Sequence, residues 1–248
     1  MSKSLEGNDL PPTAASQTPF VTLIAAPIHR TRLVWTASVG GAFVVIFGLI
    51  IRGSAIDVAV VQFLNGFHNG LIATVTDGIY NYFEPAPSII GTVLLTAVIL
   101  VVSRNLRIAS TFAVVIAATW LSLAVVKLLV HRVRPDESLL TFPFTPAQVD
   151  ASYPSGHTTF ITALVVTLVL AVSVGYRRWL VGVLGGFVVA GVGIAVVVDG
   201  LHYPSDVIGS IVWAVTVAPL VRMLWVSLVI QPIDRSRFRS ARPEQHAQ

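Results

Sequence analysis

Three polar motifs lie between Lys127 and Asp206: K-L-L-V-H-R-V-R-P (Lys127–Pro135), Y-P-S-G-H (Tyr153–His157) and H-Y-P-S-D (His202–Asp206). Each motif lies at one end of a long apolar run. If those runs cross a membrane in alternating directions, all three motifs reach the same membrane surface. The rest of the chain is then expected to be the scaffold that brings them together.

The composition is that of a membrane protein. Of 248 residues, 54% are hydrophobic and only 11% are charged, and the mean hydropathy is +0.80, whereas soluble domains carry about 25% charged residues. The pI near 9.9 does not indicate nucleic acid as a partner, because the basic residues are distributed between apolar segments and form no single patch. The absence of cysteine excludes disulfides and thiolate metal sites.

Six apolar runs are long enough to cross a hydrocarbon core of about 30 Å. They predict an all-α integral membrane protein with six transmembrane helices, at Leu33–Ile51, Pro85–Ser103, Ile108–Val126, Thr158–Tyr176, Trp179–Val198 and Val207–Ile230. The last run is interrupted by Arg222, whose side chain is expected to extend to the membrane interface.

The remaining segments are more polar. Residues 1–28 show no helical periodicity and no cleavable signal peptide, so they are expected to be a disordered tail before a membrane domain at 29–232. Residues 233–248 form a basic tail. Between the first two spans, residues 52–84 are expected to form a short interfacial helical segment, with a re-entrant segment at Leu71–Ile79 as the alternative.

Basic residues predict the orientation, because cytoplasmic loops carry an excess of Lys and Arg. Both termini lie on one side if there are six spans, and that side receives 12 of the 16 Lys and Arg residues. The other side keeps Arg52, Lys127, Arg132 and Arg134. The termini are therefore expected to be cytoplasmic, and the three motifs to lie on the periplasmic or extracellular face of the plasma membrane.

The first two motifs suit an anion. Lys127 offers a point charge and Arg134 a planar fork for a phosphoryl group, although either residue alone is better explained as an interfacial cation near lipid headgroups. Ser155 is expected to be the N-cap of the fourth span, which leaves free amides around Gly156 at the positive end of a helix, with His157 in the first turn. An ordinary capped helix is the alternative.

The third motif suits a nucleophile. His202 and Asp206 are four residues apart and share one face if the sixth helix begins near Pro204. A carboxylate that holds one imidazole nitrogen leaves the other as a nucleophile or base. A purely structural capping network remains the alternative.

Together the motifs resemble the type 2 phosphatidic acid phosphatase (PAP2) superfamily, whose pattern is K-x6-R-P, P-S-G-H and S-R-x5-H-x3-D. The match comprises Lys127, Arg134–Pro135, Pro154–His157, His202 and Asp206. The resemblance implies a lipid phosphatase that needs no metal or other cofactor. It assigns phosphate binding to Lys127, Arg134, Ser155 and Gly156. It makes His202 the nucleophile that forms a phosphohistidine, Asp206 its orienting carboxylate and His157 the acid.

The chain departs from this pattern in its third motif. Ala195 and Val196 occupy the Ser-Arg positions, so a phosphate-binding arginine is missing. His131, Arg132 or Arg52 are candidates to replace it. Asp199 adds a negative charge three residues before His202, and is expected either to hold Arg132 or Arg134 or to have a pKa raised by burial.

The leading hypothesis is therefore a membrane phosphatase that acts on a lipid phosphate or lipid diphosphate, such as a polyprenyl diphosphate (undecaprenyl diphosphate among them), phosphatidic acid or phosphatidylglycerol phosphate. The missing arginine motivates two alternatives, a non-catalytic lipid-phosphate-binding protein and a phosphotransferase. A transporter would require charged or broken helices near the bilayer midplane, and the six spans show none. The sequence does not predict the oligomeric state.

Overall fold

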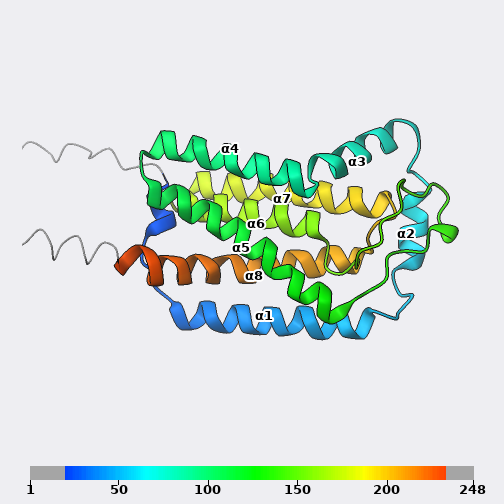
Figure 1. Ribbon diagram of the computed structural model, residues 1–248, viewed down its shortest axis with the longest axis horizontal. Helices are drawn as coiled ribbons and strands as arrows, with labels where there is room; N and C mark the ends of the chain where they lie inside the picture. The colour runs from blue at the N-terminus through cyan, green and yellow to red at the C-terminus, as the bar shows by residue number, and fades with distance from the viewer. Residues whose placement is uncertain (1–19, 233–248) are drawn as a thin grey trace, which may run out of the picture.

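The computed structural model describes residues 20–232, which form an elongated bundle of helices (Figure 1). Over that range the chain contains helices and no β-strand, which confirms the predicted all-α class. The long helices are α1 (Arg30–Ile51), α4 (Pro85–Ser103), α5 (Leu106–Val130), α6 (Gly156–Ala171), α7 (Tyr176–Val198) and α8 (Pro204–Trp225). A π-helical turn, η3 (Val226–Ile230), extends α8.

Five of these helices are long and apolar enough to cross a membrane, namely α1, α4, α5, α7 and α8 with its extension. The predicted fourth span is shorter than expected, because α6 ends at Ala171 and not at Tyr176. Its 16 residues measure about 24 Å at a rise of 1.5 Å each. The chain leaves the helix at Val172 in an extended conformation and turns at Gly175, whose φ of +127° favours glycine.

The predicted interfacial segment consists of two helices, α2 (Val58–Asn65) and α3 (Gly70–Tyr82), which meet at an angle of 119°. Figure 1 shows α2 across one end of the bundle, while α3 leads back toward α4. By length and composition this bent pair is either a broken span or a re-entrant loop. It therefore resembles the re-entrant alternative at least as closely as a single surface helix.

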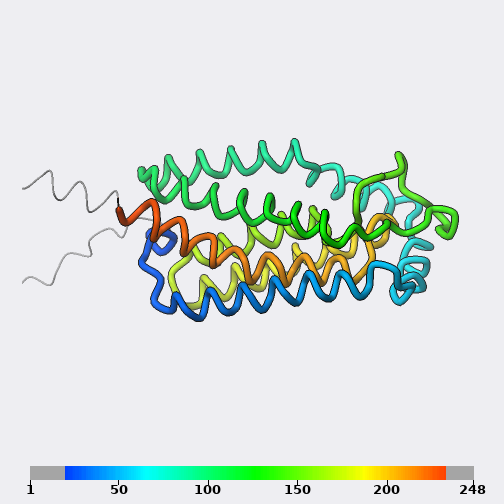
Figure 2. Tube along the Cα trace, turned by 60° about the horizontal axis from the view of Figure 1, so that its bottom comes forward, coloured from blue at the N-terminus to red at the C-terminus, as the bar shows by residue number. Residues whose placement is uncertain are grey.

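The chain enters and leaves the bundle at the end opposite α2, as the tube in Figure 2 shows. The long loop between α5 and α6 lies at the α2 end, together with the start of α8. All three polar motifs therefore occupy one end of the bundle, as their positions in the sequence predict.

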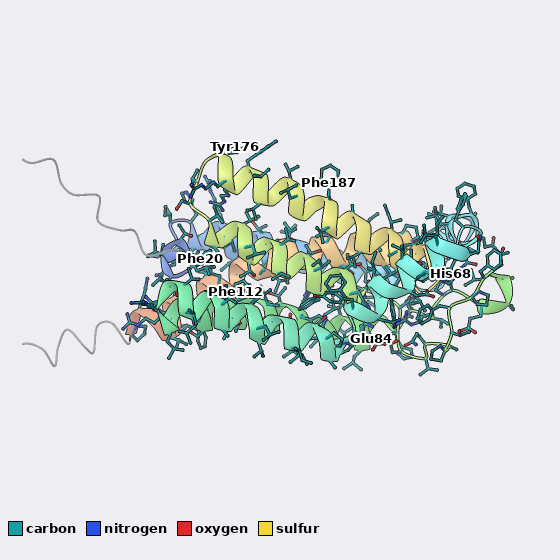
Figure 3. All side chains as sticks on the ribbon, turned by 90° about the horizontal axis from the view of Figure 1, so that it is seen from above. Phe20, His68, Glu84, Phe112, Tyr176 and Phe187 are labelled. Carbon is teal, nitrogen blue, oxygen red and sulfur yellow. The ribbon has the colours of Figure 1, made fainter. Side chains whose placement is uncertain are left out.

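Apolar side chains cover the outer surface of the long helices, as expected for contact with lipid. Figure 3 shows Phe187 on the outward face of α7, where 73% of its surface is exposed. Phe112, in contrast, is completely buried between α5 and its neighbours. This distribution agrees with a multi-pass membrane protein.

The segment before α1 is ordered in its described part, so the predicted disordered tail is wrong for residues 20–28; residues 1–19 lie outside the described range. Val21–Ile24 form a 3-10 turn, η1, in which Leu23 is fully buried. Thr22 donates a hydrogen bond to the carbonyl of Ala171 at the end of α6, at 2.6 Å. The basic tail predicted at 233–248 also falls outside the described residues.

Arg222, whose side chain is predicted to extend to the membrane interface, binds this turn at the end of the bundle. Its guanidinium donates hydrogen bonds to the carbonyls of Leu23 and Ala25, both at 2.8 Å, and to that of Thr22. A turn of 3-10 helix has several unpaired carbonyls, which explains why a cation inside an apolar run finds its partners within the protein.

Tyr153 connects the helical scaffold to the second motif. Its ring is fully buried against α1 and α8, and its hydroxyl donates a hydrogen bond to the carbonyl of Val44 at 2.7 Å. Two glycines make room for it, since a Cβ on Gly48 or Gly209 would lie 2.5 Å from a ring carbon or the hydroxyl oxygen of Tyr153. Pro154 and Ser155 follow directly, so this packing fixes the start of α6.

Replacing Gly48 by alanine is expected to lower the free energy of unfolding by about 1–3 kcal/mol, because the new Cβ overlaps Tyr153 and Val130. Gly41→Ala in the same helix is the matched control, since its Cβ would lie 3.8 Å from the nearest atom, in Trp213. The control is expected to gain slightly from helix propensity. Thermal unfolding in detergent measures both; equal stability of the two variants would contradict this packing.

Candidate active site

A cavity of about 400 Å³ lies at the motif end of the bundle, between the α3–α4 junction and α5. Five of the seven predicted site residues line it: Lys127, Arg134, Gly156, His157 and His202. The other two lie behind its wall, with Ser155 and Asp206 both completely buried. The structure thus brings residues from α5, the following loop, α6 and the α7–α8 turn into one site.

His202 is held in the turn before α8. Its amide donates a hydrogen bond to the carbonyl of Val196 at 3.1 Å. Its Nδ1 lies 3.4 Å from Oδ2 of Asp206, close but not aligned as a hydrogen bond, and its Nε2 lies 3.4 Å from Nη1 of Arg134. Burial and the adjacent Arg134 guanidinium lower the pKa of His202 to about 4, so the ring is neutral at neutral pH.

Asp206 is fixed in the first turn of α8, which begins at Pro204 as predicted. Its Oδ2 accepts a hydrogen bond from the amide of Tyr203 at 2.9 Å, and its Oδ1 accepts one from Nη1 of Arg132 at 2.7 Å. These contacts leave the carboxylate little freedom to rotate away from His202. The structure therefore agrees with an orienting carboxylate, and equally with the capping function that the sequence allows.

Arg132 lies behind the site and not in the cavity. It is almost fully buried, donates a hydrogen bond to Oγ of Ser205 at 2.6 Å, and stacks on the Tyr203 ring at 3.9 Å. Asp57 of the α1–α2 connection completes this group, 3.7 Å from Nη2 of Arg132. Arg132 is therefore committed to Asp206 and Asp57 and does not line the cavity.

The two cations of the first motif share one partner that the sequence analysis missed. Asp150 accepts a hydrogen bond from Nζ of Lys127 at 2.6 Å and another from Nη2 of Arg134 at 2.6 Å. Arg134 also donates to the carbonyl of Leu201 at 2.8 Å, which holds the guanidinium beside His202. Partial burial raises the pKa of Asp150, but the hydrogen bonds from both cations outweigh it and lower the pKa to about 2.

The start of α6 contributes the second histidine. Ser155 is the N-cap as predicted, and its Oγ accepts a hydrogen bond from the amide of Thr158 at 3.4 Å. The hydroxyl of Ser155 thus faces its own helix, and Ser155 itself does not line the cavity. His157 stacks on Tyr80 with the ring centroids 4.2 Å apart, and its buried Nε2 has no hydrogen-bond partner among the described residues.

Apolar side chains occupy positions 195 and 196, where the PAP2 pattern has Ser and Arg. Ala195 and Val196 are almost fully buried, and Val196 packs with Tyr80, Phe144 and Leu201. None of the three predicted substitutes lines the cavity: His131 and Arg52 are exposed, and Arg132 is committed to Asp206. The cavity therefore has Lys127 and Arg134 as its cationic side chains in the described part of the chain.

Asp199 is buried beside His68 and is not paired with Arg132 or Arg134 within residues 20–232. Its Oδ1 lies 3.6 Å from Nε2 of His68. Burial raises the pKa of Asp199 to about 7. Of the two predictions made for this residue, the raised pKa is the one with which the structure agrees.

Comparisons with known proteins agree with this architecture. The sequence pattern of the PAP2 superfamily matches residues 107–228, which include all three motifs. The fold is similar to that in "Crystal structure of the first transmembrane PAP2 type phosphatidylglycerolphosphate phosphatase from Bacillus subtilis", with a TM-score of 0.62 and 20% sequence identity over 81% of this chain and 98% of that one. No curated protein sequence matches at a significant level. The family match, which includes all three motifs, and the similar membrane fold confirm the predicted resemblance to the PAP2 superfamily.

Proposed function

We propose that the protein is a membrane phosphatase that removes phosphate from a lipid phosphate or lipid diphosphate. The proposal rests on one observation, that His202, His157, Lys127 and Arg134 line the same cavity. A phosphoryl group needs a nucleophile, a proton donor and positive charge around its equatorial oxygens, and this cavity supplies all three.

The reaction begins at Nε2 of His202, which attacks phosphorus while the bond to the leaving oxygen breaks. His157 donates a proton to that oxygen, and the product is a phosphohistidine on His202 plus the dephosphorylated lipid. Asp206 balances the positive charge that develops on the His202 ring. In the second step water attacks phosphorus and gives a proton to His157, so that inorganic phosphate leaves and both histidines return to their initial state.

The phosphoryl oxygens are held by Lys127, Arg134 and the amides at the start of α6. Arg134 is well placed for this, since its guanidinium lies beside Nε2 of His202. Backbone amides around Gly156 add the positive end of the α6 dipole. Electrostatic stabilisation of this kind is usually the largest contribution to phosphoryl transfer.

The apolar part of the cavity supports a lipid substrate. Besides the polar groups, the lining includes Phe83, Trp120, Leu121 and Ala124 from the α3–α4 junction and from α5. Leu121 has 67% of its surface exposed on the outside of α5. A headgroup bound at His202 can therefore leave its acyl or prenyl chain among the helices.

The substrate class includes a polyprenyl diphosphate, phosphatidic acid and phosphatidylglycerol phosphate. The distribution of Lys and Arg supports cytoplasmic termini and a reaction site on the periplasmic or extracellular face of the plasma membrane. An external site favours recycling of lipid carriers left as diphosphates on that face. The Bacillus subtilis protein of the same fold is described as a phosphatidylglycerolphosphate phosphatase, which makes that lipid the second substrate to test.

The test is phosphate release from a panel of these lipids in detergent, with a metal chelator present. Release from at least one lipid is expected, because no step above uses a metal. No release from any lipid, with or without added divalent cations, would overturn the proposal.

Replacing Asp150 by asparagine is expected to strengthen inhibition by inorganic phosphate or orthovanadate about three- to tenfold. In the present structure the Asp150 carboxylate occupies the two cations that the phosphoryl group must bind. Removing its charge removes that competition, and Asn keeps an oxygen acceptor. Asp136→Asn, an exposed carboxylate in the same loop, is the control. A higher inhibition constant in Asp150→Asn would mean instead that Asp150 orients Lys127 and Arg134.

Two alternative functions are suggested by the apolar residues Ala195 and Val196, which replace the Ser-Arg pair of the PAP2 pattern. With Lys127 and Arg134 as the cationic side chains of its described lining, the site resembles one that binds a phosphorylated lipid without turnover, or one that transfers the phosphoryl group to an acceptor other than water. A labelled substrate distinguishes them. Label in free phosphate supports hydrolysis, label in a second lipid supports transfer, and label retained in bound substrate supports a binding protein.

A further inference from the structure

His68, Asp77 and Asp199 form a second cluster of charged groups, outside the lining of the reaction cavity. One ligand atom from each residue lies within 4.8 Å of the other two. His68 precedes α3, Asp77 lies within α3 and Asp199 follows α7. Figure 3 places His68 at the motif end of the bundle, far from Phe20.

The orientation of His68 shows which of its nitrogens faces the cluster. Its Nδ1 lies 2.7 Å from the carbonyl oxygen of Phe142, and because a carbonyl only accepts, Nδ1 carries the hydrogen. Nε2 lies 2.8 Å from Oδ1 of Asp77 and 3.6 Å from Oδ1 of Asp199. In a neutral ring the lone pair of Nε2 would face two carboxylates, so a proton or a metal ion is required between them.

The surroundings of Asp199 indicate whether a proton or a metal ion lies between these groups. It is fully buried, and neither of its carboxylate oxygens has an aligned hydrogen-bond partner among the described residues, although Thr76 lies beside it. A proton on Nε2 of His68 would satisfy the short contact to Asp77 but leave Asp199 unpaired at 3.6 Å. An unpaired buried carboxylate is costly, whereas a metal ion between the three atoms would be bound by all of them.

We propose that His68, Asp77 and Asp199 bind one divalent transition-metal ion, of which Zn²⁺ and Mn²⁺ best suit one imidazole and two carboxylates. Tetrahedral ligands at about 2.0–2.2 Å from a metal lie about 3.3–3.6 Å apart, and Nε2 of His68 lies 2.8 Å and 3.6 Å from the two carboxylate oxygens. The hydrogen bond from Nδ1 to the Phe142 carbonyl is the support that metal-binding histidines usually have. Asp77 has 38% of its side chain exposed, which provides an entry path and room for bound water.

The ion would join α3 to the end of α7. Tyr80, one turn after Asp77 on α3, stacks on His157 in the reaction cavity. Metal binding would therefore stabilise the wall of the cavity without taking part in phosphoryl transfer, and the inference holds whether or not the proposed phosphatase activity does.

The test measures metal content and melting temperature of untagged protein in detergent, without substrate. Protein stripped with chelator and dialysed against Zn²⁺ or Mn²⁺ is expected to retain about one ion per chain and to melt at a higher temperature than the stripped protein. Asp199→Asn and Asp77→Asn are each expected to bind at least about tenfold more weakly and to lose the metal-dependent rise. Two control variants are expected to retain both the bound ion and the metal-dependent rise in melting temperature. They are His29→Gln, at the other end of the bundle, and His202→Ala, which removes a histidine of the reaction cavity that could itself bind a metal.

Three results would overturn the proposal: no bound ion in the wild type, binding unchanged in both aspartate variants, or binding lost in His202→Ala. A protonated His68 without metal makes a different prediction, in which Asp199→Asn melts at the same or a higher temperature than wild type whether or not metal is added. Phosphate release by Asp199→Asn in chelator then separates this ion from the reaction, because an enzyme that needs no metal for chemistry stays active there.

Discussion

Replacing His202 by alanine is expected to reduce phosphate release by at least about 1,000-fold, since the proposed nucleophile is lost and His157, the other histidine of the described cavity lining, is assigned to proton transfer. Nε2 of His202 is the nitrogen that faces the cavity, beside Arg134, while Nδ1 faces Asp206. The remaining activity would reflect attack by water on a substrate still held by the two cations. Initial rates at saturating lipid measure the loss.

The matched control is His29→Ala, an exposed histidine at the opposite end of the bundle, which is expected to retain wild-type activity. Melting temperatures of both variants show whether His202→Ala is folded. Near-wild-type turnover in a folded His202→Ala protein would mean that another group attacks phosphorus.

The second largest effect is expected for Arg134→Lys, with a loss of about 100–1,000-fold in kcat/KM, comparable to the loss of one oxyanion donor. Lysine keeps the charge but not the planar fork with which arginine binds two oxygens at once. Arg134 also donates to the Leu201 carbonyl at 2.8 Å, a contact that holds its guanidinium next to His202. The missing arginine at position 196 makes the loss larger, because Lys127 is then the only other cationic side chain of the described cavity lining.

Arg52→Lys is the control for this substitution, because Arg52 is an exposed cation that follows α1 at the same end of the bundle and lies outside the cavity lining. It is expected to leave kcat/KM unchanged. If Arg134→Lys behaves like the control, Arg134 contributes only its charge, and the fork geometry plays no part in phosphate binding.

The site could be predicted from the sequence where its chemistry is local. Ser155 at the start of α6 and Pro204 at the start of α8 follow from helix-capping preferences, which depend on residues within one turn. The apolar runs then require both helix starts to face the same membrane surface. These two constraints place His157 and His202 at the same membrane surface, and the packing of α6 against α8 brings them to one cavity.

Contacts between distant segments could not be predicted in this way. Asp150 lies 23 residues from Lys127 in a loop without periodicity, so nothing local indicates that it binds both cations. Arg132 and Asp206 are 74 residues apart, and the direction of the arginine depends on the α5–α6 loop. His68 reaches Asp199 only because α2 and α3 bend at 119°.

Two segment boundaries were also predicted wrongly, because they depend on contacts between residues that are far apart in the sequence. Hydropathy predicted that the fourth span continues to Tyr176, because Val172 and Val174 are as apolar as the helix before them. The helix ends earlier because Thr22 of η1 binds the carbonyl of Ala171 and the chain turns at Gly175. Residues 20–28 were assigned to the tail for a related reason, since their partners Ala171 and Arg222 are far away in the sequence.

Chemical trapping of the phosphoryl group during turnover tests the central claim most directly. Wild-type protein mixed with substrate labelled in the transferred phosphate and quenched within milliseconds in base is expected to carry acid-labile label on the peptide that contains His202. His202→Ala treated in the same way is expected to carry none. Label on another residue, or phosphate release in the wild type without any labelled protein under conditions where the second step is slowed, would contradict a phosphohistidine at His202.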